Sequence, residues 1–338
     1  MPKALITGVA GQDGSYLAEL LIEKGYETWG LVHAGSGTST SLIDHLLGQT
    51  GSGVLRLVEG DLTDEDRLTS VIHDIQPDEI YNLAAQTFVP TAYERPTYTA
   101  DVNGLGPVRI LHAIRGMEHP ARFYQASSCE MFGEVTEVPQ SEETPFRPRN
   151  PYATGKLLAY WSIRDFRKTY GTFACNGICF NHESPRRSQH FVTRKITIAA
   201  ARIKLGLQDK LMLGNLDALK DWGFAGDYVE AMWLMLQQDT PDDYVLSSGE
   251  SHTVREFLDE VFGTLDLDWH DYVEVDPGFY RPVENMHLQG DSSKAERVLG
   301  WRPKHSFRDL AKMMTEADLK LISSDSSFGA DNKRKPIG

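Results

Sequence analysis

Gly8-Val9-Ala10-Gly11-Gln12-Asp13-Gly14 lies between a short apolar stretch, residues 4–7, and an amphipathic segment, residues 15–24. Glycines at this place permit a tight turn and let backbone N–H groups approach a pyrophosphate at the positive end of a helix. The spacing is G-x-x-G-x-x-G, and taken alone the loop could be a structural turn. Its position between the first strand and the first helix instead favours a dinucleotide site built from Gly8, Gly11, Gln12, Asp13 and Gly14.

Strands and helices alternate in the residues around this loop. The predicted strands are 4–7, 26–32, 54–58, 79–84, 121–127 and 172–181. The predicted helices are 15–24, 64–75, 103–115 and 151–170. Such alternation is typical of a parallel sheet with helices on both faces and right-handed crossovers. The sequence therefore predicts an α/β fold with a doubly wound parallel sheet of the Rossmann type.

The pattern changes after His182. Amphipathic helices are predicted at 192–205, 227–237 and 254–263, but strands become sparse. We expect an NAD(P)-binding Rossmann domain at 1–182 and a smaller, mainly substrate-binding domain at 183–323, from which some segments return to the sheet. Residues 324–338 are polar with few apolar side chains, so we expect them to form a disordered tail.

The composition is that of a soluble globular enzyme, with 41% hydrophobic residues in a chain of 338. The formal net charge of −14 argues against a nucleic-acid partner, which would need a basic face. No apolar run approaches the roughly 20 residues that span a bilayer. The N-terminus enters a strand without a signal-peptide segment. We therefore expect a cytoplasmic protein without a membrane partner.

The three cysteines do not indicate a disulfide framework. Cys175 and Cys179 share a predicted strand that separates them by roughly 13 Å, beyond the about 7 Å that a disulfide allows between Cα atoms. We interpret both as core thiols. The spacing of cysteines and histidines does not indicate a zinc site either, so no metal is expected.

Two further loops follow predicted strands, at the edge where a doubly wound sheet binds its ligand. Asp61 and Leu62 come after the third strand, where they can meet an adenine. The fourth strand is followed by Leu83, Ala84, Ala85 and Gln86, and the two small alanines would let the backbone run beneath a dinucleotide. Taken alone, each loop could instead be a helix cap or a packing site.

The exit of the second strand does not decide between NAD and NADP. NAD-specific folds often have an acidic residue here and NADP-specific folds an arginine. Residues 33–38, His-Ala-Gly-Ser-Gly-Thr, contain neither. The residues by themselves therefore indicate an NAD(P) cofactor without a choice of phosphate.

Tyr152 and Lys156 are one helical turn apart, so their side chains share a helix face. A Tyr phenol has a reference pKa of about 10, and we expect Lys156 to lower it by stabilising the phenolate. This pair, at the start of the helix between the fifth and sixth strands, predicts proton removal from a substrate hydroxyl during hydride transfer. Ser128, at the end of the fifth strand, would hydrogen-bond the same oxygen, or could simply cap the strand end.

Glu130 adds a group that simple alcohol oxidation does not require. It could be a structural acid that pairs with an arginine or caps a helix. As a catalyst it would remove a proton from the carbon next to a newly made ketone. Protonated Glu130, or its neighbour Cys129, could then help a hydroxyl leave on the far side. The net reaction would be loss of water with the cofactor returned to its starting state.

A resemblance to a known family rests on four blocks: the glycine loop, Ser128-Cys129-Glu130, Tyr152 with Lys156, and Asn181-His182-Glu183-Ser184-Pro185-Arg186-Arg187. They resemble the extended short-chain dehydrogenase/reductases and, among these, the GDP-mannose 4,6-dehydratase family. Further similar blocks lie at 191–195, 221–223 and 279–284, and the resemblance runs from about Lys3 to Ile322.

The resemblance implies a hydro-lyase that depends on NADP, or else on NAD. It implies conversion of GDP-mannose to GDP-4-dehydro-6-deoxy-D-mannose, a step of nucleotide-sugar metabolism and deoxysugar biosynthesis, by a homodimer or homotetramer. The implied catalytic residues are Ser128, Glu130, Tyr152 and Lys156. The implied cofactor contacts, besides the loops above, are Tyr98, Tyr152, Lys156, His182 and Arg187. The implied nucleotide-sugar contacts are Ser128, Glu130, Asn181, Val192, Lys195, Lys220, Arg281 and Glu284.

The sequence departs from the family pattern in three places. Ser128-Cys129-Glu130 replaces Thr-Ser-Glu, His33-Ala34 replaces an arginine pair, and Lys220 replaces an arginine before Asp-Trp-Gly. These changes would fit a dehydratase of a related GDP-sugar, such as a GDP-heptose. The residues also leave open a nucleotide-sugar epimerase or 4-keto reductase, which needs no base at Glu130, and a non-catalytic redox-sensing Rossmann protein.

Overall fold

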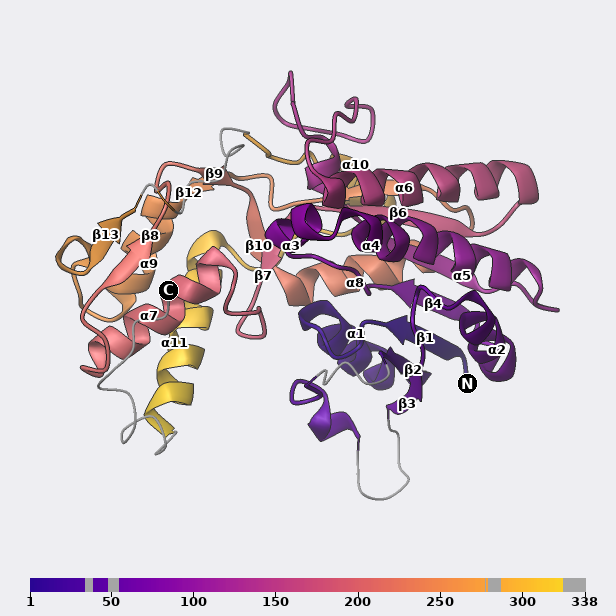
Figure 1. Cartoon of the computed structure of the whole chain (residues 1–338), viewed down its shortest axis with the longest axis horizontal. Coiled ribbons are helices and arrows are strands. Elements are labelled where there is room, and N and C mark those ends of the chain that lie inside the picture. Colours follow the sequence, from indigo (N-terminus) through magenta and orange to yellow (C-terminus); the bar gives the residue numbers. More distant parts are fainter. Residues whose placement is uncertain (34–38, 48–54, 277, 279–286, 325–338) are drawn as a thin grey trace.

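The computed structural model describes residues 1–33, 39–47, 55–276, 278 and 287–324 (Figure 1). The strands of its main sheet are β1 Lys3–Thr7, β2 Glu27–Val32, β3 Arg56–Glu59, β4 Glu79–Asn82, β5 Arg122–Ser128, β6 Ala174–Cys179 and β11 Asp243–Leu246. Among the described residues these strands form one seven-stranded sheet in the order β11-β6-β5-β4-β1-β2-β3. All neighbouring strands are parallel. The strand order reverses direction between β1 and β4, which is where a doubly wound sheet binds ligands.

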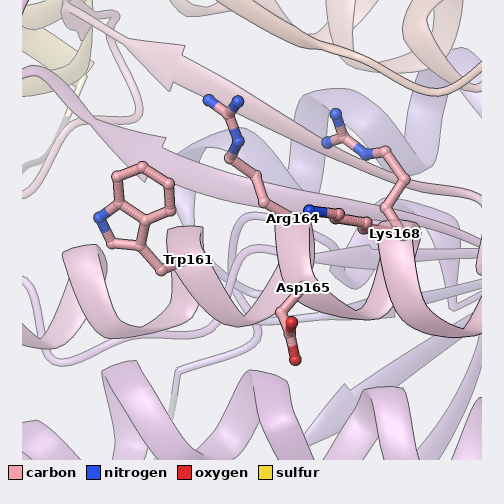
Figure 2. Close-up of a pocket in the computed structure, with 5 residues that line it drawn as sticks. Trp161, Arg164, Asp165 and Lys168 are labelled. Atoms are coloured by element: carbon pink, nitrogen blue, oxygen red, sulfur yellow. The ribbon is translucent and has the colours of Figure 1, made fainter.

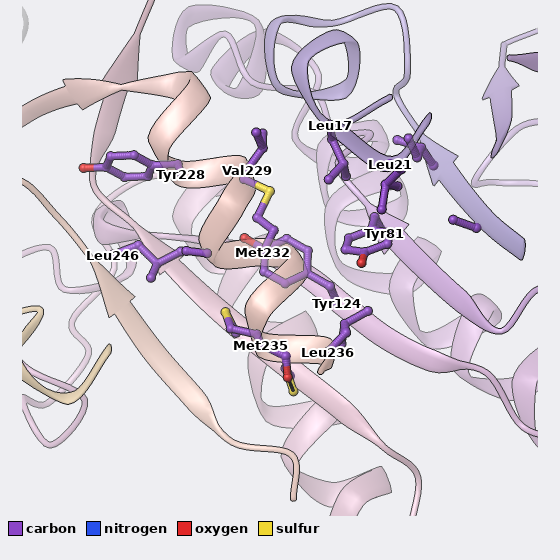
Figure 3. Packing of buried hydrophobic residues seen from close by; sticks show 14 of the residues in the cluster. Leu17, Leu21, Tyr81, Tyr124, Tyr228, Val229, Met232, Met235, Leu236 and Leu246 are labelled. Atoms are coloured by element: carbon purple, nitrogen blue, oxygen red, sulfur yellow. Dashed lines mark hydrogen bonds between the residues drawn. The ribbon is translucent and has the colours of Figure 1, made fainter. Parts of the chain in front are cut away.

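Helices cover both faces of this sheet. One face is covered by α1, Gln12–Glu23, and α8, Ala225–Leu236, which pack against each other (Figure 3). The other face is covered by α2 Glu65–Ile75, α5 Gly106–Arg115 and α6 Pro151–Tyr170. Side chains alternate along β1, so Ala4 and Ile6 enter the core under α1 and α8 while Leu5 enters the core under α2, α5 and α6. Each fully buried leucine or isoleucine contributes roughly 1.5–3 kcal/mol relative to exposure.

Helix α6 begins and ends at recognisable residues. The Asn150 side chain accepts a hydrogen bond from the backbone N–H of Ala153, and Pro151 occupies the first turn, where its missing N–H costs nothing. Gly171 ends the helix with a φ of +67°, which favours glycine. These signals fix where Tyr152 and Lys156 stand at the edge of the sheet.

A second core lies beside the sheet. It is formed by α7 Val192–Lys204, α9 Val254–Thr264 and α11 Phe307–Ser324, which pack against one another. Two short strand pairs accompany it, β8 Leu211–Leu213 with β13 Val273–Val275 and β9 Leu219–Lys220 with β12 His252–Thr253. A third pair, β7 Asn181–Glu183 with β10 Trp222–Phe224, lies between this core and the sheet (Figure 1).

The shorter elements are η1 Asp44–Leu46, α3 Val89–Glu94, α4 Pro96–Ala100, the π-helical η2 Asp101–Leu105, η3 Cys129–Met131, η4 Trp269–Asp271 and α10 Ser293–Leu299. The predicted doubly wound parallel sheet is confirmed. Several bounds differ. The predicted strand 172–181 is divided into β6 and β7, the predicted helix 103–115 begins within η2, the predicted helix 15–24 begins at Gln12, and the predicted strand 79–84 ends at Asn82. Within the described ranges, none of the helices is both long and apolar enough to cross a membrane.

Segments from the later part of the chain join the sheet: β11 pairs with β6, and α8 packs on α1. The domain boundaries 1–182 and 183–323 remain a prediction. The predicted disordered tail, 324–338, lies outside the described residues except for Ser324, which ends α11. Cys175 and Cys179 are buried free thiols, which confirms their interpretation as core residues.

Candidate active site

The glycine loop connects β1 to α1 and has no room for a side chain at Gly8 or Gly14. Gly8 has a φ of +70°, and a Cβ there would lie 2.8 Å from the backbone nitrogen of Ala84. A Cβ at Gly14 would lie 2.3 Å from the carbonyl oxygen of Gly8. The loop therefore packs directly on the turn after β4, and the start of α1 stays open to a ligand.

A cleft of about 730 Å³ lies beside this loop, at the carboxyl ends of β1, β2 and β4. Its volume falls in the range of about 300–1,000 Å³ that is usual for small-molecule sites. The predicted cofactor residues that line it are Gly8, Gly11, Gln12, Asp13, Gly14, Asp61, Leu62, Leu83, Ala84, Ala85, Gln86, Tyr98 and Arg187. The sequence did not predict the lining residues Ser39, Ser41, Phe88 and Arg186, although the first three lie in the segments that follow β2 and β4.

His182 lies behind the glycine loop and does not line the cleft. Its Nδ1 is 2.7 Å from the carbonyl oxygen of Phe180 and its Nε2 is 2.8 Å from Asp13 Oδ2. Burial alone would lower the pKa of His182, but the Asp13 carboxylate and these hydrogen bonds outweigh burial and raise it. Burial likewise acts to raise the pKa of Asp13, yet His182 lowers it overall. This imidazole–carboxylate pair ties the loop to β7.

The exit of β2 carries an imidazole–carboxylate pair. His33 Nε2 is 2.9 Å from Asp61 Oδ2, and Asp61 Oδ1 accepts a hydrogen bond from the Thr63 N–H at 2.9 Å. Burial acts to raise the pKa of Asp61, but the bonds from Thr63 and the His33 imidazole lower it overall. His33 and Asp61 both line the cleft, as do the hydroxyl-bearing Ser39 and Ser41.

The predicted catalytic residues meet where β5 and α6 approach each other. Ser128 ends β5, and its Oγ accepts a hydrogen bond from the Glu130 N–H at 3.2 Å. The Ser128 side chain also forms a hydrogen bond with the Tyr152 side chain. Lys156 Nζ donates to the carbonyl oxygen of Ala126 at 2.7 Å. The structure thus brings Ser128, Glu130, Tyr152 and Lys156 together, and none of these four lines the cleft.

The expected lowering of the Tyr152 pKa is wrong for this arrangement. Burial raises the pKa of Tyr152, and the Glu130 carboxylate raises it further, against the opposing hydrogen bond from Ser128. Lys156 directs its ammonium group to Ala126, and its Nζ is 5.8 Å from the centre of the Tyr152 ring. Burial lowers the pKa of Lys156 to about 8.

Glu130 is held by a residue that the sequence did not predict as part of the site. Asn150 Nδ2 donates to Glu130 Oε2 at 3.1 Å. Among the ion pairs of the described residues none includes Glu130, so an arginine-paired structural acid is not supported there. An asparagine directly before a proline at a helix start signals a cap. Nothing in that signal points to Glu130.

Cys129 is buried in an apolar cluster. Its side chain is 2% exposed and packs with Met131, Phe132, Ile178 and Phe180. Burial raises the pKa of the thiol well above its usual value. A thiol in such a core is poorly placed to help a hydroxyl leave, so the structure does not support that hypothesis.

The predicted nucleotide-sugar contacts come from several elements. Asn181 starts β7 and pairs with Trp222 of β10. Lys220 ends β9 and is two residues before Trp222 in the chain. Val192 and Lys195 belong to the first turn of α7, and burial lowers the pKa of Lys195. Arg281 and Glu284 lie outside the described residues.

A second hollow, of about 460 Å³, lies on the outer side of α6 (Figure 2). It is lined by Trp161, Arg164, Asp165, Arg167 and Lys168, all from this one helix. Arg167 Nη2 is 2.5 Å from Asp243 Oδ1, so the Arg167 guanidinium already forms an ion pair within the protein. The predicted site residues within the described ranges lie away from this hollow, and it is not the candidate site.

Comparisons with known proteins identify the family of this chain. The family model described as GDP-mannose 4,6 dehydratase matches residues 5–314. GDP-mannose 4,6 dehydratase 2 of Arabidopsis thaliana is 55% identical over 329 residues, which cover 95% of this chain and 88% of the plant protein. GDP-mannose 4,6-dehydratase of Yersinia enterocolitica is 48% identical over 353 residues, covering 95% and 94%. Among solved structures, UDP-glucose 4-epimerase of Thermus thermophilus in complex with NAD has a TM-score of 0.80 at 26% identity, covering 94% and 98%.

Proposed function

We propose that this chain, which belongs to the GDP-mannose 4,6-dehydratase family, converts GDP-mannose to GDP-4-dehydro-6-deoxy-D-mannose with loss of water. One observation carries the proposal: a carboxylate, Glu130, lies beside the Ser128–Tyr152 pair. Alcohol oxidation needs only the pair. A carboxylate next to it adds a base for a C–H bond made acidic by a neighbouring carbonyl. Together they support an elimination reaction and a hydro-lyase.

The cleft fits a nicotinamide dinucleotide. The close approach of Gly8 to Ala84, with no room for a Cβ, leaves a smooth backbone cradle at the start of α1. When bound there, the nicotinamide supplies a hydride acceptor that later gives the hydride back. Of the protein's own residues, the loop N–H groups would face the pyrophosphate, and Asp61 with Leu62 would face the adenine.

Ser128 and Tyr152 act at the C4 hydroxyl of the sugar. Tyr152 Oη removes the hydroxyl proton while the C4 hydrogen leaves as hydride, and Ser128 holds the same oxygen through its hydrogen bond. The high pKa of Tyr152 makes its phenol a strong base once ionised, and a positive charge nearby is needed to ionise it. Lys156, which is 3% exposed and lies one helical turn further on, supplies one such charge.

Glu130 acts at C5. It takes the C5 proton, whose acidity the C4 carbonyl has raised, and the electron pair of that bond forms a double bond to C6 as the C6–O bond breaks. Glu130 then donates its proton to the departing hydroxyl, which leaves as water. Addition of a hydride at C6 and of a solvent proton at C5 completes the 6-deoxy product. No net oxidation or reduction remains.

Lysines line the proposed path of the nucleotide sugar. Lys195 and Lys220 would meet the diphosphate by charge, and Asn181 and Val192 would border the sugar, as would Arg281 and Glu284. Lys220 also lies close enough to the catalytic turn to oppose the rise of the Cys129 pKa. The substrate site would thus connect β9 and α7 with η3.

We place NADP in the cleft, with NAD as the competing assignment. The Asp61 carboxylate, which could repel a 2′-phosphate, already accepts a hydrogen bond from the Thr63 N–H and pairs with the His33 imidazole. Ser39 and Ser41, whose hydroxyls could contact such a phosphate, also line the cleft. The test is to release the nucleotide from the purified protein and identify it by mass spectrometry. NADP supports this assignment, and NAD overturns it.

We also propose a cytoplasmic homodimer or homotetramer, with no nucleic-acid or membrane partner. The oligomer is supported by exposed apolar surface on η2 and α6, where the side chains of Leu105, Leu158 and Trp161 are 44%, 44% and 54% exposed. Light scattering measures the state directly, and a monomer at micromolar concentration would contradict the proposal.

The reaction itself is tested by turnover of GDP-mannose in deuterated water. A 4-keto-6-deoxy product with solvent deuterium at C5 and no net change in reduced cofactor is expected. A 4-epimer, or a product without deuterium, would overturn the elimination. GDP-heptose in a parallel reaction reveals whether a related GDP-sugar is preferred.

A further inference from the structure

We propose that Asn150 is a positioning residue that aims the Glu130 carboxylate at the substrate and fixes it relative to Tyr152. The inference rests on the proposed dehydratase function and deepens it. Asn150 would act through Glu130 and would not touch the reacting atoms.

Both ends of the Asn150 amide have a partner. Its Oδ1 accepts from the Ala153 N–H at 2.8 Å, and its Nδ2 donates to Glu130 Oε2 at 3.1 Å. An amide has one acceptor end and one donor end. Because the helix cap requires the oxygen to face Ala153, the amino group must face the other way, where Glu130 provides an acceptor. The capping of α6 by Asn150 thus orients the amino group that donates to the Glu130 carboxylate.

Glu130 needs such a support. It lies in the three-residue turn η3, and the bond from its N–H to Ser128 Oγ orders its backbone but not its carboxylate. A glutamate side chain has several rotatable bonds, so its carboxylate samples many positions without a partner. Occupation of Oε2 by the Asn150 amide restrains these bonds and leaves Oε1 for the C5 proton.

The same contact links the two halves of the reaction. Asn150 is two residues before Tyr152, at the start of the helix that also carries Lys156. A single side chain therefore sets the distance between the group that acts at the C4 hydroxyl and the group that acts at C5. Displacement of a reacting group by about 1 Å can lower a rate about 10²-fold.

Asn150→Asp separates the two contacts. Aspartate caps helices about as well as asparagine, so the bond to Ala153 is retained, while the donor to Glu130 is replaced by an acceptor. Asn150→Ser also retains a cap oxygen but adds no charge, which distinguishes loss of the donor from charge repulsion. Asp64→Asn is the matched control, because Asp64 caps α2 through the Arg67 N–H and lies far along the chain from Glu130 and Tyr152.

The readouts are the absorbance of bound reduced cofactor after mixing with GDP-mannose, the incorporation of solvent deuterium at C5, and the steady-state constants. In Asn150→Asp and Asn150→Ser we expect reduction of the cofactor at close to the normal rate and dehydration slowed about 10-fold to 100-fold. Reduced cofactor should then accumulate during turnover. The effect should lie in kcat with KM little changed, and Asp64→Asn should behave as the unaltered protein.

Two results would overturn the role of Asn150. One is normal dehydration in both Asn150 variants without accumulation of reduced cofactor. The other is an equal loss of cofactor reduction and dehydration, which would mean that Asn150 serves only the helix. Failure of the unaltered protein to form the dehydrated product at all would instead contradict the proposed function, so the two failures can be told apart. Circular dichroism of each variant confirms that the protein measured is folded.

Discussion

Tyr152 and Glu130 lie in one site but are supported in different ways. Tyr152 stands in the first turn of α6, a helix of 20 residues with one face buried in the core, and Lys156 is 3% exposed one turn further on. Glu130 stands in a turn of three residues, and its carboxylate is held by the Asn150 side chain. The oxidation half of the site is therefore built on regular structure, and the elimination half on a single side-chain hydrogen bond. A change in the elimination half should leave oxidation intact, whereas a change in the oxidation half should stop both.

The largest effect is expected from Tyr152→Phe, which removes the group that starts the oxidation. General acid–base groups contribute typically about 10²–10⁴-fold to a rate, and we expect a loss near the upper end because both half-reactions depend on oxidation. Mixing with GDP-mannose should leave the bound cofactor oxidised. If the bound cofactor is reduced at the normal rate in this variant, Tyr152 does not belong to the oxidation half, and the division of the site into two halves is wrong.

A smaller, graded effect is expected from pH. Burial lowers the pKa of Lys156 to about 8, so Lys156 is an ammonium below that pH and a neutral amine above it. Because the pKa of Tyr152 is raised, its phenolate fraction grows about tenfold per pH unit, and above pH 8 the shrinking fraction of Lys156 ammonium cancels that growth. The value of kcat/KM should therefore rise with pH up to about 8 and then level off. Lys156→Arg keeps its charge, so its kcat/KM should go on rising above this pH, whatever its maximal rate. Levelling off at the same pH in Lys156→Arg would assign it to another group.

The smallest effect on activity is expected from changes at Cys129, which lies between Ser128 and Glu130 in the sequence but is buried in an apolar cluster. Cys129→Ala and Cys129→Ser should change kcat less than about 3-fold, because the thiol touches no reacting atom. The serine hydroxyl would lack a partner in this apolar cluster, and stability should fall by about 1–3 kcal/mol, measured by urea unfolding. A tenfold loss of kcat with unchanged stability would show that Cys129 belongs to the site after all.

The oxidation half could be predicted from the sequence because its signals are local. Tyr152 and Lys156 are separated by one helical turn, and the glycine loop directly follows a strand, so spacing alone predicted their common orientation and the cleft beside them. The parallel sheet followed from the alternation of strands and helices in the same way.

Contacts between distant segments could not be predicted. Asn150 meets Glu130 across 20 residues, and His182 meets Asp13 across 169. The direction of the Cys129 side chain depends on the packing of β5 and α6, and the raised pKa of Tyr152 depends on burial that spacing does not reveal. Each of these features is a product of tertiary packing.

Glu130→Gln tests the central claim most directly, because glutamine keeps the shape of the side chain and can still accept from Asn150 but cannot remove a proton. In deuterated water with GDP-mannose, we expect the bound cofactor to become reduced at close to the normal rate. Dehydration and deuterium incorporation at C5 should fall about 10²–10⁴-fold. Dehydration at close to the unaltered rate, with deuterium at C5, would contradict the assignment of Glu130 as the base.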